Sequence, residues 1–516
     1  MKLLGLPDWT VLVITVFVLL YLYATKKKNY WKNQNVVYEK LSLIFGPASR
    51  ILFHPLHEAD EKRYKKYGKL FGIFEGGNPS LLVAEPDLVK LILVKDFQAL
   101  PNRRPIKLFD PLLDNMMNIA PVEQWRKIRP SASPAFSTGK LRKMNALIED
   151  CAKVTAEHLK KAAKNNEDVD IKQRFYLYFN MCVIARCAFG TRLDSHTDVT
   201  NEFVTRARKA FSGVITLPMI LLVLFPVLFN WLKIKPFNSD TFVYFKNVCQ
   251  NIIKNRQQES NRQEDFLQLM MDAQQTGIAT AAAENVQETD TQLFNLDSDV
   301  KPDTLTEDEA MAQCVLFFLA GQDTTSSVIA HAMYMLALNP EIQAKLREEA
   351  DECFATHGKE PPLDVISKLP YIHGVVSEAL RMFPPAPRIE RSAIEDYVLG
   401  DTKIKIPKGC VIAVPVFAMH YDPEYFPDPH AFVPERFSAE NVASIRPYTY
   451  LPFGAGPRNC IGMRFALQAV KLCLLHSVHS VEFVRTEKTK VPLEFCKGFG
   501  ILSAKDVTVG IRERRQ

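Results

Sequence analysis

The sequence lacks paired cysteines, a strong charge excess and a complete nucleotide-binding motif. Its ten cysteines are scattered without a CxxC pair, which argues against disulfides, zinc ribbons and redox motifs and favours a reducing compartment. A net charge of +6 in 516 residues is too small to predict nucleic-acid binding. Gly454-x-Gly456 fails as a dinucleotide fingerprint, because Asn459 stands where the third glycine is needed. His57-Glu58 begins like a zinc-protease motif, but the second histidine is missing.

The composition indicates one large globular unit. Hydrophobic residues make up 47% and charged residues 24% of the chain, as in ordinary folded proteins that bury a core. Helical periodicity dominates residues 86–255 and 306–382, whereas strand-like alternation is confined to residues 70–83, 404–416 and the C-terminus. The sequence therefore predicts a mainly α fold with small β-sheets.

A glycine-rich loop surrounds one cysteine in the run Phe453-Gly454-Ala455-Gly456-Pro457-Arg458-Asn459-Cys460-Ile461-Gly462. A thiolate is a good iron ligand, and backbone N–H groups and a helix N-terminus near it lower its pKa. Gly456 suits the positive φ of a tight loop, and Gly462 leaves room for a flat macrocycle beside the next helix. Phe453 can shield the sulfur, and Arg458 can hold a carboxylate of the cofactor. The run predicts a haem-thiolate loop with Cys460 as the iron ligand, against the alternative of an inert buried cysteine.

This loop resembles the haem-binding signature of the cytochrome P450 family, and further motifs follow in the order of that family. The resemblance implies the cytochrome P450 fold, a thiolate-ligated haem b and a single catalytic domain. One such motif is Glu378-x-x-Arg381, whose side chains share a helix face, followed later by Arg436. Alone, the pair would be interpreted as a solvated surface ion pair. In the resembling family, the three residues form a buried ion network that braces the cysteine loop.

Residues 306–338 predict one long helix, which opens with the capping box Thr306-Glu307-Asp308-Glu309 and ends before Pro340. Polar residues interrupt its apolar character in the run Ala320-Gly321-Gln322-Asp323-Thr324-Thr325. In one interpretation, the hydroxyls bond back to carbonyls one turn earlier and bend the helix. The run also resembles the oxygen-activation motif of the cytochrome P450 family. That resemblance implies a notch beside the iron at Ala320 and Gly321, with Asp323 and Thr324 as a proton relay.

Several basic side chains and one aromatic donor resemble family contacts to the two haem propionates. Trp125 and Arg129 lie one helical turn apart, Arg103 precedes them, and Arg391 follows a proline-containing break. Each of these would be an ordinary surface residue if it were considered alone. Together with Arg458, they would surround the two carboxylates with enough hydrogen-bond donors.

The resemblance also implies a substrate pocket above the iron. The residues that it assigns to this pocket are Phe317, Ala320, Gly321, Ala386, Pro387 and Phe499, together with the loop 106–119. Residues 102–105 and 422–429 are most similar to the animal branch of the family that oxidises xenobiotics, notably in insects. Variable loops set selectivity within one fold, so the motifs leave the particular substrate open.

The N-terminal residues 1–28 predict a membrane anchor. Residues 9–24 are mostly apolar and are followed by three lysines, Lys26 to Lys28, as in a single helix whose lysines stay in the cytosol. A cleaved signal peptide is the alternative, but its positive region would precede the apolar stretch. We therefore expect a protein of the endoplasmic reticulum membrane whose catalytic domain, residues 29–516, faces the cytosol.

Two internal segments differ from the rest of this domain. Residues 214–233 form a second apolar stretch, whose two prolines make it a poor spanning helix. This stretch predicts a surface that dips into the membrane and lines an entrance for lipophilic molecules, with Trp231 and Lys233 at the interface. Ordinary core is the alternative. Residues 274–303 are polar and acidic, and they predict a mobile surface loop.

The motifs together imply an NADPH- and O2-dependent monooxygenase that inserts one oxygen atom into lipophilic molecules such as xenobiotics, insecticides, steroids or fatty acids. The resemblance implies NADPH-cytochrome P450 reductase as the electron donor, with cytochrome b5 as an optional second partner. Lys140 and Lys143 flank the helix where an acidic reductase would dock, and a solvated charged face explains them equally well. One alternative is a haem-thiolate isomerase or dehydratase, which the acid–alcohol pair Asp323-Thr324 disfavours. The other is a non-catalytic haem protein that binds lipophiles.

Overall fold

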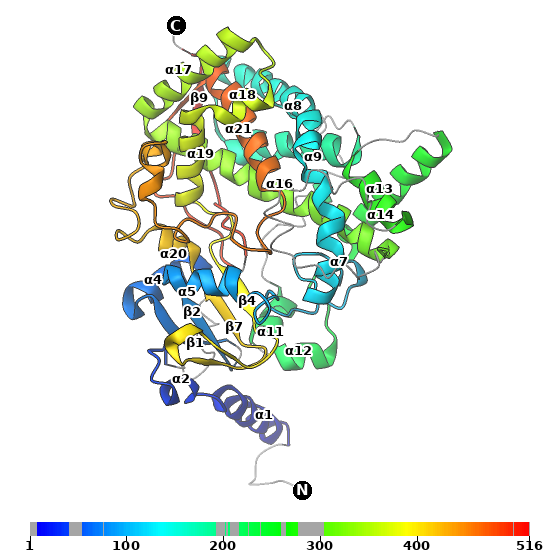
Figure 1. Ribbon diagram of the computed structural model, residues 1–516, viewed down its shortest axis with the longest axis vertical. Helices are drawn as coiled ribbons and strands as arrows, with labels where there is room; N and C mark the ends of the chain where they lie inside the picture. The colour runs from blue at the N-terminus through cyan, green and yellow to red at the C-terminus, as the bar shows by residue number, and fades with distance from the viewer. Residues whose placement is uncertain are drawn as a thin grey trace.

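The computed structural model describes residues 8–40, 54–75, 77–191, 202, 205–206, 216–224, 226–237, 239–259, 265–276, 304–498 and 500–514. Over these residues the protein is mainly helical, with three small sheets. The longer helices gather in the upper part of Figure 1, and the four-stranded sheet lies toward the opposite end. The predicted fold class is confirmed.

The helix α16 (Glu307–Leu338) runs through the helical part of the molecule and is largely buried. Its capping box forms as predicted, because Thr306 Oγ1 accepts a hydrogen bond from Glu309 N at 3.2 Å and Glu309 Oε2 accepts one from Thr306 N at 2.9 Å. The helix ends where Pro340 begins the next one, since proline cannot continue an α-helical hydrogen-bond ladder. The prediction of a single long helix is confirmed.

Other helices pack around α16 and around one another. The longer ones are α8 (Thr138–Lys164), α9 (Leu177–Phe189), α13 (Ser239–Glu259), α14 (Phe266–Thr276), α17 (Pro340–His357), α19 (Pro370–Met382) and α21 (Met463–Ser480). The shorter ones are α4 (Leu56–Tyr67), α5 (Pro86–Lys90), α6 (Pro111–Asp114), α7 (Val122–Ala132), α18 (Leu363–Lys368) and α20 (Val416–His420). Single turns of other helix types are η2 (Leu91–Lys95), η3 (Ser133–Phe136), η4 (Lys172–Tyr176), η6 (Gly400–Thr402), η7 (Pro434–Phe437) and η8 (Val442–Ser444).

Strands form in all three regions where the sequence alternates, and β3, β4 and β5 form outside them. The largest has the order β1-β2-β7-β4, with β1 (Leu70–Glu75), β2 (Asn78–Val83), β7 (Val411–Val414) and β4 (Ile389–Ser392). The strands β2 and β7 are parallel, whereas β1 and β4 pair antiparallel to their neighbours. A second sheet has the order β3-β9-β8, with β3 (Asp168–Asp170), β9 (Thr508–Arg512) and β8 (Glu482–Val484), and a third pairs β5 (Tyr397–Val398) with β6 (Lys405–Ile406).

The chain before the first sheet is fastened to it by Trp31 in α2 (Tyr30–Asn33). Its side chain is fully buried, and its indole N–H donates to the Ile73 carbonyl at 3.0 Å. The ring covers Gly72, where an added Cβ would approach the ring carbons to 2.4 Å. A glycine at this position of β1 therefore allows the indole to lie directly on the strand.

The predicted membrane-spanning anchor is not confirmed. The helix α1 runs from Asp8 to Thr25. Within the part of the chain that the structure describes, no helix combines the length and the apolar character needed to cross a membrane. Large apolar side chains on α1 are nevertheless exposed: Trp9, Leu12, Ile14, Val18, Tyr21 and Leu22.

The second apolar stretch forms two short helices, α11 (Leu217–Leu224) and α12 (Pro226–Leu232). Pro226 begins α12, so the prolines divide the stretch as the sequence suggests. Leu217 is 68% exposed and Trp231 is 76% exposed, which disfavours the core alternative for these side chains. The first three residues of the predicted loop 274–303 belong to α14, which continues to Thr276, and the remainder lies outside the described residues.

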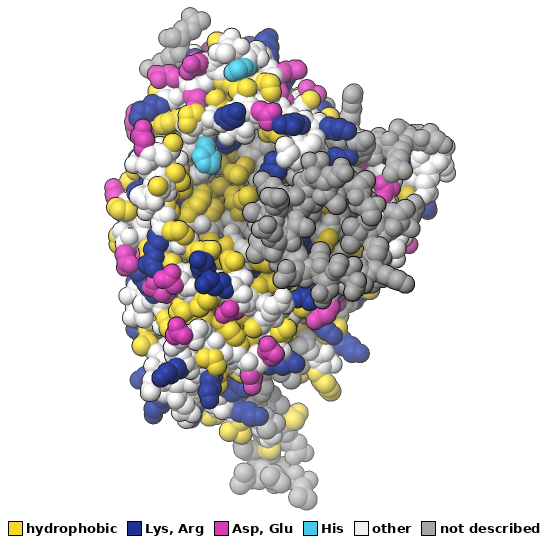
Figure 2. All heavy atoms as spheres, viewed as in Figure 1, with side chains coloured by type: hydrophobic (Ala, Val, Ile, Leu, Met, Phe, Trp, Pro, Cys, Tyr) yellow, Lys and Arg dark blue, Asp and Glu magenta, His cyan; other side chains and the backbone are white. Residues whose placement is uncertain are grey.

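Charges of both signs are mixed on the face that Figure 2 shows, where lysines and arginines alternate with aspartates and glutamates around hydrophobic side chains. This mixing fits the small net charge of +6. No disulfide joins the ten cysteines, all of which lie among the described residues.

Candidate functional site

The cysteine loop precedes α21 and is closed by its own backbone. The amide of Cys460 donates to the carbonyl of Phe453 at 2.9 Å, and the amide of Asn459 donates to the carbonyl of Gly456 at 3.0 Å. Gly456 has a φ of +71°, and a Cβ there would lie 1.9 Å from the carbonyl oxygen of Leu93. No other residue type fits this position, which agrees with the predicted need for glycine. At Gly462, by contrast, a Cβ would meet Phe136 only at an ordinary 3.7 Å.

Cys460 is exposed, whereas eight of the other cysteines are buried and only Cys496 is also exposed. Burial of the surrounding loop raises the pKa of the Cys460 thiol above its ordinary value. The backbone N–H of Gly462, followed by the charges of Arg129 and Arg103, lowers the pKa of the same thiol. The side chain is therefore accessible to a ligand, and Gly462 and the two arginines offset only part of the upward pKa shift, so binding of iron would have to displace the thiol proton.

Arginines from distant parts of the chain converge on this loop. Arg458 donates to the carbonyls of Met117 and Ala120 at 3.3 and 3.1 Å, and its guanidinium lies 4.6 Å from the ring centroid of Trp125. Arg103 donates to the carbonyl of Arg458 at 3.1 Å. Arg129 lies one helical turn after Trp125 in α7. It donates to the backbone carbonyl and to the side-chain Oδ1 of Asn459, each at 3.0 Å.

Burial and mutual repulsion disfavour the charged form of two arginines in this cluster. Burial, then the charges of Arg103 and Arg458, lowers the pKa of Arg391 to about 9. Burial, then Arg103 and Arg129, lowers the pKa of Arg458 to about 9 as well. The Nε atoms of Arg391 and Arg458 are buried and have no hydrogen-bond partner. Since buried charges require opposite charges or full hydrogen bonding, the cluster fits an anionic group such as the two propionates of haem.

The structure also brings together the three residues of the predicted ion network. Arg381 donates to both carboxylate oxygens of Glu378, at 2.8 and 2.9 Å, and both side chains are fully buried. Arg436 Nε lies 3.3 Å from Glu378 Oε1. Arg381 also donates to the carbonyls of His420 and Pro429, at 2.8 and 2.9 Å. The network thus connects α19 to the loops between α20 and the cysteine.

The polar turn of α16 combines features of both interpretations of the sequence. Thr324 Oγ1 donates to the carbonyl of Ala320 at 2.8 Å, and Ser326 Oγ donates to that of Gln322 at 2.8 Å, so the hydroxyls do bond back one turn. The carboxylate of Asp323 instead forms an ion pair with Lys172, which lies outside α16, with 2.8 Å between Asp323 Oδ1 and Lys172 Nζ. The structure therefore gives the side chains of Asp323 and Thr324 separate partners.

Gly321 lies where α9 packs against α16, and its predicted role as a notch beside the iron stays a prediction. A Cβ at Gly321 would lie 3.0 Å from Ile184 Cδ1 of α9. Asn180 of α9 donates its side-chain amide to the carbonyls of Gly321 and Gln322, at 2.5 and 2.7 Å. The absent side chain thus allows α9 to approach α16 closely. Ala320, not Gly321, is the exposed position of this turn.

Three residues of this region were missed by sequence reasoning: Lys172, Asn180 and Asn459. Asn180 is a fully buried polar residue in a mainly apolar helix, and its polar side chain among apolar neighbours was a usable signal. Lys172 begins η4, the turn that leads into the same helix.

The predicted pocket residues lie in different surroundings. Phe317 stacks on Phe266 with a centroid distance of 4.7 Å and lies 5.8 Å from Phe465 of α21, so it joins α16 to the helix that follows Cys460. Ala386 is exposed and Pro387 is buried. Phe499 lies outside the described residues. Their role in binding substrate stays a prediction.

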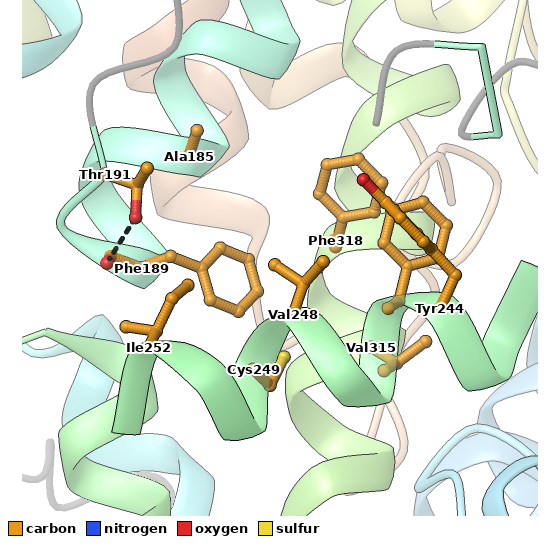
Figure 3. A pocket seen from close by; sticks show the side chains of 10 residues that line it. Ala185, Phe189, Thr191, Tyr244, Val248, Cys249, Ile252, Val315 and Phe318 are labelled. Atoms are coloured by element: carbon orange, nitrogen blue, oxygen red, sulfur yellow. Dashed lines mark hydrogen bonds between the residues drawn. The ribbon is translucent and has the colours of Figure 1, made fainter. Parts of the chain in front are cut away.

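A separate apolar cavity of about 190 Å³ lies between α9, α13 and α16. Figure 3 shows its lining, with Phe318 on α16 and Cys249 and Val248 on α13. At about 100° per residue, Phe318 lies about 200° around the helix from Ala320. This cavity therefore lies on the opposite face of α16 from Ala320, and it is smaller than the roughly 300–1,000 Å³ typical of ligand pockets.

Comparison with known proteins gives consistent matches over nearly the whole chain. The family model described as Cytochrome P450 matches residues 39–508. The chain is 36% identical to cytochrome P450 3A9 of Rattus norvegicus and 35% identical to cytochrome P450 3A11 of Mus musculus, each over 96% of this chain and 94% of the relative. It is 33% identical to cytochrome P450 3A14 of Cavia porcellus, over 99% of this chain and 97% of the relative.

Proposed function

The chain belongs to the cytochrome P450 family of haem-thiolate monooxygenases, and from this premise we propose that it oxidises lipophilic small molecules with electrons from NADPH. The overall reaction would be RH + O2 + NADPH + H⁺ → ROH + H2O + NADP⁺. When bound, haem supplies the activation of dioxygen and the insertion of one oxygen atom. The substrates would include xenobiotics, with insecticides, steroids and fatty acids as further candidates.

One observation carries the proposal: an accessible cysteine lies in a loop beside the buried guanidiniums of Arg391 and Arg458, whose Nε atoms have no hydrogen-bond partner among the described residues. In the proposed site Cys460 is the iron ligand, and Phe453 and the loop glycines shape its surroundings. Arg103, Arg391 and Arg458 hold the propionates together with Trp125 and Arg129. The anionic group would complete their hydrogen bonding and offset their mutual repulsion.

The residues on the other side of the proposed site would bind the substrate and manage protons. The apolar lining assigned to Phe317, Ala320, Pro387 and Phe499 favours lipophilic molecules. Asp323 and Thr324 are the groups that would hold and pass protons, because they are the titratable and hydroxyl side chains at the exposed turn of α16.

Partners and location complete the proposal. NADPH-cytochrome P450 reductase would supply electrons through the face that carries Lys140 and Lys143, with cytochrome b5 as an optional partner. Residues 29–516 would form one catalytic domain on the cytosolic side of the endoplasmic reticulum membrane, and residues 1–28 its anchor. The exposed apolar side chains of α1 and Trp231 of α12 support contact with a membrane.

The first experiment is to reduce the purified protein under carbon monoxide and record its Soret band. The wild type is expected to give a thiolate-type carbonyl band that is lost in C460A. C496A is the matched control, because Cys496 is the other exposed cysteine, and its band should equal that of the wild type. A well-folded wild type with an imidazole-type band, or without haem, would contradict the proposal.

The second experiment distinguishes the reaction classes. Product formation from a panel of lipophilic substrates is measured with reductase, in the presence and absence of NADPH. Strict dependence on NADPH is expected for a monooxygenase. Rearrangement of organic peroxides without NADPH would instead indicate an isomerase, and spectral shifts without turnover would indicate a binding protein.

A further inference from the structure

A buried lysine holds the acidic residue of the polar turn in α16. Lys172 Nζ lies 2.8 Å from Asp323 Oδ1, and the two side chains are 3% and 13% exposed. The same nitrogen donates to Ser503 Oγ at 3.0 Å. Two of the three ammonium protons of Lys172 are therefore directed at partners from two distant segments of the chain.

The backbone around Lys172 is firmly fixed. Lys172 begins η4, a single π-helical turn between β3 and α9, and such turns occur often at functional sites. The preceding Ile171 donates its amide to the carbonyl of Val507 at 3.1 Å. Because β3 pairs with β9 directly before this point, the turn that carries Lys172 is fixed to the end of a sheet.

Ser503 belongs to a C-terminal hairpin that borders the predicted substrate pocket. Phe495 and Ala504 form a bridge in this hairpin, and the amide of Leu502 donates to the carbonyl of Pro385 at 2.8 Å, next to the predicted pocket residue Ala386. The hairpin also meets α16 through the rings of Phe495 and His331, whose centroids are 6.2 Å apart. Any displacement of the hairpin by substrate would thus reach Lys172 through Ser503.

The neighbouring side chains do not replace Lys172 as a partner of Asp323. His331 is buried two turns along α16, and both of its ring nitrogens lack hydrogen-bond partners. Thr324 is committed to the carbonyl of Ala320. Removal of the Lys172 ammonium would leave the Asp323 carboxylate in a largely buried position without its cation, where it would be free to rotate.

We propose that Lys172 is a positioning residue that orients Asp323 and connects it, through Ser503, to the C-terminal hairpin at the substrate pocket. This inference rests on the proposed function, because it assigns Asp323 a part in proton delivery. Lys172 acts through Asp323 and touches neither substrate nor cofactor. It ensures that the carboxylate takes its working position when the hairpin is in place.

The test compares K172M, K172R and S503A with the wild type, as holoproteins with reductase. The measured quantity is the amount of product formed per NADPH consumed, with the spectral dissociation constant of the substrate as a second readout. K172M is expected to lower product per NADPH about tenfold. A positioned proton-transfer group contributes roughly 10²–10⁴-fold to the rate, and K172M misplaces the Asp323 carboxylate without removing it. The substrate dissociation constant should stay within about twofold of the wild type, and K172R should recover most of the loss.

A matched control separates this role from a loss of stability. Lys471 is also a buried lysine, but its Nζ bonds only to the carbonyls of Ile366 and Ser367. K471M should leave product per NADPH unchanged. S503A should lower the ratio by itself and add nothing in the K172M background, because Ser503 acts through Lys172.

The infrared band of the carbon monoxide complex provides a readout that does not depend on turnover. K172M is expected to shift the C–O stretching band, because a charge beside the polar turn has been removed, and K172R is not. Unchanged product per NADPH together with an unchanged band in K172M would overturn the proposal. A wild type that binds haem but forms no product would refute the monooxygenase function instead, and the infrared band would then decide the role of Lys172.

Discussion

Replacing Glu378 by Gln removes the counter-charge of a fully buried arginine. Glu378 Oε1 accepts hydrogen bonds from Arg381 Nη2, the amide of Val433 and Arg436 Nε, at 2.9, 3.1 and 3.3 Å, and Oε2 accepts one from Arg381 Nε at 2.8 Å. Only one oxygen remains in glutamine. If that oxygen keeps the three bonds of Oε1, the new NH2 group faces the N–H of Arg381, so two donors oppose each other.

The expected loss follows from this geometry. Removing one partner of a buried ion pair costs about 3–5 kcal/mol, because the other charge stays buried without compensation. The entropy of unfolding is about 2.1 cal/mol/K per residue, or roughly 1 kcal/mol/K for a chain of this length. E378Q should therefore lower the thermal midpoint by about 3–5 °C. The direction is firm because Arg381 and Glu378 are both completely shielded from water.

The measurement is thermal unfolding of haem-loaded protein at one fixed scan rate, followed by Soret absorbance and circular dichroism, since large proteins often unfold irreversibly. E435Q is the matched control. Glu435 lies beside Arg436 and pairs with Lys345 at 3.2 Å, but it is 44% exposed, so its loss should cost less than about 1 kcal/mol. A midpoint for E378Q no lower than that of E435Q would refute the reasoning.

Two further predictions concern other positions. G456A should purify with less haem per protein and a lower thermal midpoint. Its Cβ would overlap the Leu93 carbonyl in a left-handed backbone conformation, which should lower the free energy of unfolding by at least about 1–3 kcal/mol. Pyridine haemochrome absorbance measures the haem content, and full loading would contradict this expectation. Burial, and then the charge of Lys172, lowers the pKa of His331 to about 3. Below about pH 6.5 the unfolded chain therefore binds a proton at this histidine that the folded chain does not bind. The free energy of unfolding falls by about 1.4 kcal/mol for each pH unit below that point. H331F should therefore lose about 2 kcal/mol less than the wild type between pH 6.5 and 5 in denaturant titrations, and equal losses would show that His331 does not cause this acid sensitivity.

Features that depend on neighbouring residues could be predicted from the sequence. The long helix was predictable because its cap at Thr306 and its stop at Pro340 are local signals. The turn at Gly456 was predictable because a positive φ has a strong residue preference. The mainly helical class followed from periodicity, which reports the local backbone and the buried face together.

Features that depend on distant partners could not be predicted. Asn180 meets Gln322 across 142 positions, and no local pattern announces that pairing. The contact of Gly321 with Ile184 of α9 could not be predicted for the same reason. Phe317 was assigned to the pocket from its place along the helix, whereas its contacts with Phe266 and Phe465 depend on how three helices pack.

The buried Trp31 fixes one end of the short linker that follows α1. Six residue steps separate Trp31 from Thr25, the last residue of α1. At about 3.3–3.6 Å per residue, the end of α1 can lie at most about 20 Å from Trp31. Whatever surface holds α1 must therefore lie close to β1. Figure 1 shows α12 toward this same end of the molecule, so the exposed Trp231 would face the surface to which the chain is tied.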